Sequence, residues 1–98
     1  MTTSDPNQSA LNILQNTPHG DHDQETEILL EAAAFDIATY HSPTGDQAAR
    51  HGYLSQALKN FLLSIVHNCP PGADRSRAIA AAREAKHWAS AAVALENS

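Results

Sequence analysis

Residues 69–95 read CPPGADRSRAIAAAREAKHWASAAVAL and decide the fold that the sequence predicts. The Pro-Pro-Gly breaker is followed at once by Asp74, and this order is typical of a turn leading into a helix, because aspartate accepts the free amide protons of a first helical turn. We therefore expect a helix over residues 74–96. Small apolar residues recur in it at three- and four-residue spacing, which predicts a buried face made of Ala78, Ala81, Ala85, Trp88, Ala92 and Leu95. A face this small favours a tight helical hairpin or an oligomeric seam.

A second long helix is expected over residues 45–67, after the breaker at residues 42–45. Thr44 and Gln47 have the spacing of a capping box that opens such a helix. The connection to the last helix is short, so the two helices must run antiparallel. The bulky stripe expected to fill the small alanine face is Leu54, Leu58, Phe61 and Ile65.

Two shorter helices are expected before this hairpin. The first covers about residues 6–15 with Asp5 as its cap, and the second covers about residues 24–40 with Asp23 as its cap. The expected buried stripe of the second is Ile28, Ala32, Phe35 and Thr39. No strand-like alternation is long enough for a sheet, so the sequence predicts an all-α fold, divided into an acidic N-terminal segment (residues 1–23) and one helical domain (residues 24–98).

Size and composition limit what the chain can do. With 98 residues and 42% apolar content, we expect one domain with a modest core and no deep pocket enclosed within one protomer. The lone Cys69 excludes an internal disulfide framework. The sequence shows neither a membrane-length apolar run nor the order of a signal peptide, so we expect a soluble, cytoplasmic protein.

Charge is divided unevenly along the chain. Residues 1–46 hold eight acids and no lysine or arginine, whereas residues 47–98 hold six of these bases and three acids. Either the two halves dock on each other, within or between protomers, or the basic half meets an anion. Arginines at a helix amino terminus suit a phosphate, because free amides and the helix dipole attract anions there. The expected ligand-binding residues are Arg75 and Arg77, followed by Lys59, Arg50 and Tyr53.

The histidine-rich stretch from His19 to Asp23 reads HGDHD. The His22-Asp23 pair is similar to the metal-ligand pair of His-Asp phosphohydrolases, but a solvated loop with Asp23 as a helix cap explains the stretch by turn chemistry alone. The other histidines do not pair at helical metal-ligand spacing, and no motif orders a nucleophilic triad. We therefore expect no catalytic residues, no metal and no cofactor, and leave the role of this stretch open.

The last helix resembles a known family. Its pattern consists of Pro70, an arginine at position 75 or 77, Glu84-Ala85, Trp88-Ala89 and the small residues 91–94. This pattern is similar to the C-terminal helix of the hairpin in phage counter-defence proteins that act as sponges for the cyclic oligonucleotide signals of CBASS-type bacterial immunity. The resemblance covers about residues 46–95, and its specific part is residues 70–94. Ser90 departs from it, because the family pattern usually has asparagine there.

The resemblance implies a homo-oligomer, with a hexamer as the expected assembly, that sequesters cyclic di- or trinucleotides between protomers without cleaving them. For a phage-encoded chain, the implied location is the host cytoplasm, with neither membrane nor DNA as a partner. The alternative from another class is a helical assembly or adaptor protein without a small-molecule ligand. A nucleic-acid-binding regulator is disfavoured by the net charge of −5.

Overall fold

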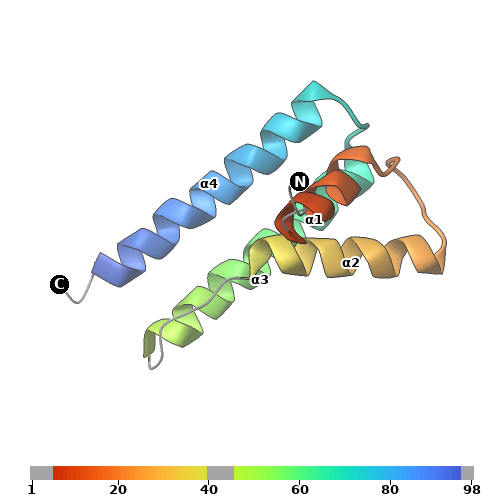
Figure 1. The fold of residues 1–98 in the computed structure, drawn as a ribbon. Coiled ribbons are helices and arrows are strands. Elements are labelled where there is room, and N and C mark those ends of the chain that lie inside the picture. Colours follow the sequence, from red (N-terminus) through yellow and green to blue (C-terminus); the bar gives the residue numbers. More distant parts are fainter. Residues whose placement is uncertain (1–5, 40–45, 96–98) are drawn as a thin grey trace, which may run out of the picture.

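The computed structural model describes residues 6–39 and 46–95, and all of the regular secondary structure over these residues is α-helical (Figure 1). The expected caps Asp5 and Thr44 lie outside these ranges. No strand occurs in the described part of the chain, so the all-α prediction is confirmed. The four helices are α1 (Pro6–Asn16), α2 (Gln24–Ala38), α3 (Asp46–Asn68) and α4 (Ala73–Leu95).

The two long helices, α3 and α4, form the expected antiparallel hairpin (Figure 1). Cys69 ends α3 by donating its backbone N–H to the carbonyl of Ile65 at 2.9 Å. Gly72 follows the two prolines with φ +153°, a conformation that glycine adopts readily. The helix α4 begins one residue earlier than expected, and the N–H of Ser76 donates to the carbonyl of Gly72. Asp74 therefore lies inside the first turn, where its charge complements the helix dipole.

Helix α2 begins where local chemistry predicts. The backbone N–H of Thr26 donates to Oδ1 of Asp23 at 2.8 Å, which confirms Asp23 as the N-cap. This hydrogen bond lowers the pKa of the Asp23 carboxyl because it stabilises the charged form. Glu25 and Glu27 occupy the first turn, as expected from the dipole.

The buried faces differ from those expected on three helices. On α4, the expected stripe is wrong, because Trp88 is 63% exposed and Leu95 is 67% exposed. On α2, the expected stripe is also wrong, because Ile28 and Phe35 are exposed. On α3, Leu58 and Ile65 are buried as expected, but Phe61 is exposed. The buried residues of these helices that replace the expected ones are Leu30, Ala33, Ala34, Ile37, Ala38, Leu62, Val66, Ile79 and Ala82.

All four helices contribute to one core. Helix α1 adds Ala10 and Leu14, which are 3% and 0% exposed, to the same buried cluster as the residues of α2, α3 and α4. In Figure 1, α2 packs against α1 and crosses α3, while α4 runs along α3. Helices α2 and α4 both pack on α3, and the hollow described below is lined by residues of all three helices. In the described part of the chain, no helix is long and apolar enough to cross a membrane.

Candidate functional site

Arg75, the first of the expected ligand residues, is buried in the protein. Its side chain is among the largest fully buried ones, with the residue 1% exposed. Nε donates to the carbonyl of Cys69, Nη1 to those of Leu14 and Thr17, and Nη2 to those of Val66 and Cys69. All five N–H donors of the guanidinium are thus used within the chain. Arg75 is not exposed to a ligand, contrary to the expectation from its position at a helix start.

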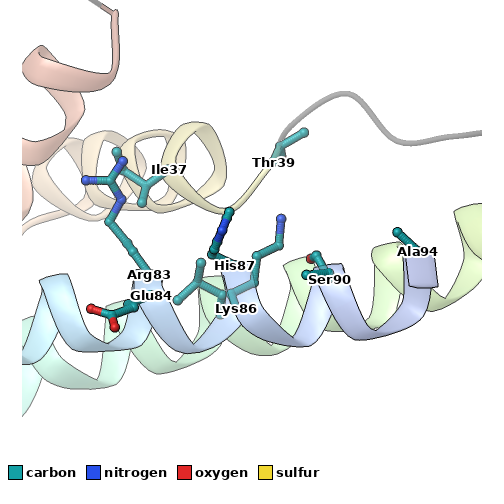
Figure 2. Close-up of a pocket in the computed structure, with 10 residues that line it drawn as sticks. Ile37, Thr39, Arg83, Glu84, Lys86, His87, Ser90 and Ala94 are labelled. Carbon is teal, nitrogen blue, oxygen red and sulfur yellow. The ribbon is translucent and has the colours of Figure 1, made fainter. Parts of the chain in front are cut away.

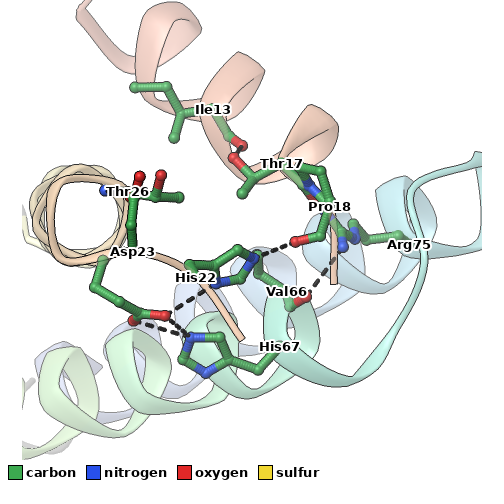
Figure 3. Close-up of polar contacts among 10 residues, drawn as sticks. Ile13, Thr17, Pro18, His22, Asp23, Thr26, Val66, His67 and Arg75 are labelled. Atoms are coloured by element: carbon green, nitrogen blue, oxygen red, sulfur yellow. Dashed lines mark hydrogen bonds and ion pairs between the residues drawn. The ribbon is translucent and has the colours of Figure 1, made fainter. Parts of the chain in front are cut away.

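The buried guanidinium joins the ends of two other helices. Leu14 is in the last turn of α1 and Val66 is in the last turn of α3, so Arg75 satisfies carbonyls that would otherwise lack partners. Figure 3 shows the contact with Val66. Its positive charge also lies at the negative ends of both helix dipoles. Burial lowers the pKa of the guanidinium, but the carbonyls around it stabilise the charged form.

The other expected ligand residues do not gather around one point. Arg77 is exposed at the start of α4, with a loose ion pair of 3.9 Å to Asp74. Lys59 is paired with Glu31 at 2.9 Å, which links the basic half of the chain to the acidic half within one protomer. Arg50 and the 77% exposed Tyr53 lie toward the opposite end of the hairpin from its turn. Arg50 is 18 residues before the end of α3, or about 27 Å at 1.5 Å per residue.

A hollow with charged walls lies between the end of α2 and the second half of α4 (Figure 2). Its volume is about 530 Å³, and Leu58 of α3 forms part of its apolar lining. Ile37 and Thr39 line it on the α2 side. The residues of α4 that line it are Arg83, Glu84, Lys86, His87, Ser90, Ala91 and Ala94.

Two cationic side chains and one histidine lie along the edge of this hollow. Arg83, Lys86 and His87 are spaced three and four residues apart, so they project from one side of α4. Figure 2 shows all three rising from α4 toward α2, while the Glu84 carboxylate points away from α2. Over residues 6–39 and 46–95, no carboxylate is ion-paired with Arg83. Partial burial lowers the pKa of the Lys86 ammonium, and a bound anion would offset this effect.

Ser90 provides a neutral hydrogen-bonding group in the same wall. The residue is 5% exposed, and its Oγ has no hydrogen-bond partner among the described residues. A buried hydroxyl without a partner costs free energy, so such a group in a native protein calls for an explanation. A ligand in the hollow that accepts or donates a hydrogen bond at Ser90 would supply the missing partner.

The hollow therefore combines groups that suit an anion with a surface that suits an apolar ring. Arg83 and Lys86 carry the positive charge that a phosphate would require, and His87 and Ser90 offer hydrogen-bonding groups. Ile37, Leu58 and the alanines of α4 provide apolar contact. Sequence reasoning missed this site, although Arg83 and Lys86 lie three residues apart and neither has an acid three or four residues away. Adding His87 to that helical spacing is the signal that points to this side of α4.

A second polar cluster lies near the start of α2. His22 and His67 both contact the carboxylate of Glu27, at 2.9 Å and 3.0 Å. In the described part of the chain, these three residues are the one group with the donor atoms and the spacing for a metal ion. A hydrogen bond to the carbonyl of Pro18, followed by the bond to Glu27, raises the pKa of His22. The pKa of Glu27 is lowered, chiefly by its bond to His22.

Comparison with known proteins identifies no relative. Neither protein families, curated proteins nor solved structures give a significant match to this chain.

Proposed function

We propose that this protein is a non-catalytic sponge that binds cyclic di- or trinucleotides and lowers the free concentration of these signals. The observation that carries the proposal is the hollow of about 530 Å³ with Arg83, Lys86 and His87 along its edge. Its wall also contains the hydroxyl of Ser90, which has no hydrogen-bond partner among the described residues. Its volume is within the range of about 300–1,000 Å³ typical of small-molecule sites. The apolar lining suits a nucleobase and the basic edge suits a phosphodiester.

The ligand's chemistry favours a site shared between protomers. A cyclic dinucleotide carries two phosphodiesters, whereas one hollow offers one set of basic side chains. Two copies related by a twofold axis would present two such sets to the two halves of the ligand. The hollow is open to its surroundings on one protomer, so a second copy would also exclude water from the bound ligand.

An exposed apolar groove supports assembly of the protein. It lies between α3 and α4, has a volume of about 350 Å³, and is lined by Leu54, Ala57, Leu58, Phe61, Ala82, Ala85, Lys86 and Ala89. Phe61 is 55% exposed on one protomer, and Trp88, which lies in sequence between the lining residues Ala85 and Ala89, is 63% exposed. Large exposed apolar side chains grouped in this way are typical of protein contacts. We propose a homo-oligomer, with the hexamer implied by the resemblance of residues 70–94 to phage sponges.

In this proposal the protein acts in the cytoplasm of the infected host as a counter-defence factor against CBASS-type immunity. Sequestration requires tight binding and no turnover. Ligand recovered after heat denaturation of the complex should be chemically unaltered by chromatography. Linear products in more than stoichiometric yield would make the protein an enzyme.

A thermal-shift panel of cyclic di- and trinucleotides, run beside linear nucleotides, tests the proposal. A ligand at 100 times its Kd should stabilise the native state by about 2.7 kcal/mol. Replacing Arg83 with alanine should raise the Kd of that ligand by roughly 10- to 150-fold, because a charge-assisted hydrogen bond contributes about 1.5–3 kcal/mol. Arg77→Ala is the matched control, since it removes an exposed arginine from the same helix outside the hollow.

The apolar groove also supports one alternative function, that of a helical assembly or adaptor protein without a small-molecule ligand. Oligomerisation together with no response to any cyclic nucleotide would support it and contradict the sponge. Equal loss of affinity in the Arg83 and Arg77 variants would show that binding is a property of the whole surface rather than of the hollow.

A further inference from the structure

His22, Glu27 and His67 come from three separate parts of the chain and meet at one point (Figure 3). His22 is in the loop between α1 and α2, Glu27 is in the first turn of α2, and His67 is in the last turn of α3. One ligand-type atom from each lies within 4.8 Å of the other two. The histidine rings are 5.4 Å apart between their centroids.

The hydrogen bonds around His22 determine which of its nitrogens is available. Nε2 is hydrogen-bonded to the carbonyl oxygen of Pro18, which can only accept, so Nε2 carries a proton. In the neutral ring, Nδ1 then has a lone pair, and this lone pair points at Oε2 of Glu27 from 2.9 Å. Two lone pairs at this distance repel each other. A positive charge, either a proton or a metal ion, must therefore lie between them.

We propose that His22, Glu27 and His67 bind a divalent transition metal, with Zn²⁺ as the preferred ion. Two imidazoles and one carboxylate are a ligand set that zinc accepts, at about 2.0–2.2 Å from each ligand atom. Tetrahedral ligands at that bond length are about 3.3 Å apart. The present contacts of 2.9–3.0 Å between Glu27 and the two rings need to widen by only a few tenths of an ångström.

The surroundings also suit a metal ion. A ligating histidine typically donates its other ring N–H to a carbonyl, as His22 does to Pro18. Glu27 and His67 also line an open hollow of about 380 Å³, together with Gly20, Asp21 and Asn68. This space admits water or the carboxylate of Asp21 as a fourth ligand.

The bound metal would reinforce a junction that the backbone already makes. The N–H of Gly20 donates to the carbonyl of His67 at 2.9 Å, so the loop after α1 is attached to the end of α3. Metal ligation by His22 and His67 would add a second link across the same junction. In this proposal the metal links two segments of the chain, and its site is separate from the hollow lined by Arg83 and Ser90.

Calorimetric titration of Zn²⁺ into the full, tag-free chain after chelator treatment tests the proposal. One ion should bind per chain, and the thermal midpoint should rise. Co²⁺ in place of Zn²⁺ should give visible absorption bands of a low-coordinate site. His67→Ala should weaken metal binding by roughly 100-fold or more, because even partners outside the ligand shell are worth about 10- to 100-fold.

Two controls separate this site from adventitious binding. His19→Ala removes an exposed histidine from the same loop, and Cys69→Ser removes the thiol; both should bind Zn²⁺ as the unaltered chain does. Glu27→Gln provides a second test of the site if His67→Ala does not fold. The proposal is overturned if no stoichiometric ion binds, or if the Glu27 and His67 variants bind as tightly as the His19 variant. In either case a proton holds the cluster together.

Discussion

The guanidinium of Arg75 donates a hydrogen bond of 3.0 Å to the backbone carbonyl of Leu14, which is 61 positions earlier in the chain. Through this contact, the first turn of α4 holds the end of α1. The same side chain reaches Val66 at the end of α3, so one residue joins three helices. Arg75, which its position in the sequence suggested as a ligand-binding residue, is thus a buried residue that holds helix ends together.

Arg75→Ala should destabilise the protein strongly. The change removes a set of charge-assisted hydrogen bonds and leaves buried carbonyls without donors, each of which costs about 1–3 kcal/mol. We expect a loss of about 3 kcal/mol or more in the free energy of unfolding, measured by urea denaturation. Arg77→Ala, two residues away and exposed, should change it by less than about 0.5 kcal/mol. Equal effects of the two changes would contradict the capping role of Arg75.

Ser90→Ala should raise the stability of the ligand-free protein and weaken its binding of ligand. The buried Oγ has no partner among the described residues, so its removal should stabilise the ligand-free protein by about 1 kcal/mol. The same change should weaken the binding of a cyclic nucleotide that forms a hydrogen bond with this hydroxyl. Chemical denaturation and ligand titration of one variant measure both effects. A variant that loses stability while keeping its affinity would show that Ser90 has a structural partner instead.

Lys86→Met should alter the pH dependence of stability. The folded-state pKa of Lys86 is lowered by desolvation, so the burial cost is full at neutral pH, where both states are charged. As the pH rises through the folded pKa toward the unfolded value of about 10.4, the folded state loses its proton first and the cost is relieved. The advantage of the Met variant in ligand-free protein should therefore be present near pH 7 and shrink with rising pH. Denaturation curves at several pH values measure this difference.

Ala85→Glu should disrupt assembly without unfolding the protomer. Ala85 is exposed and lines the apolar groove, so a carboxylate there would be desolvated by a second copy. Light scattering should show a smaller particle for this variant than for the unaltered chain. Ala80→Glu introduces the same change at an exposed position of α4 outside the groove, and it should keep the size of the assembly. A monomeric unaltered chain at micromolar concentration would remove the proposal of an oligomer.

Helix boundaries were predictable because the signals that place them are local. Asp23 accepts the amide of Thr26 three residues later, and the Pro-Pro-Gly turn ends one helix and starts the next within a few positions. The buried face of α4 was not predictable in the same way. Alanine occurs on every side of this helix, so several stripes of similar apolarity compete. The stripe that contains Ile79 and Ala82 is buried, and the stripe that contains Trp88 is exposed.

The same contrast between local signals and tertiary packing applies to the candidate site. The spacing of Arg83, Lys86 and His87 on one side of a helix is determined by the sequence alone, because it depends only on helical geometry. Whether that side faces solvent, core or a hollow depends on where the end of α2 lies, and tertiary packing decides this. Arg75 shows the opposite outcome, since the carbonyls of distant helix ends surround it. The sequence by itself determined the helices and their charges, because these follow from contacts within a few residues; the tertiary structure decided which charge is buried and which is free to bind, because burial is a property of segments that meet only in the folded chain.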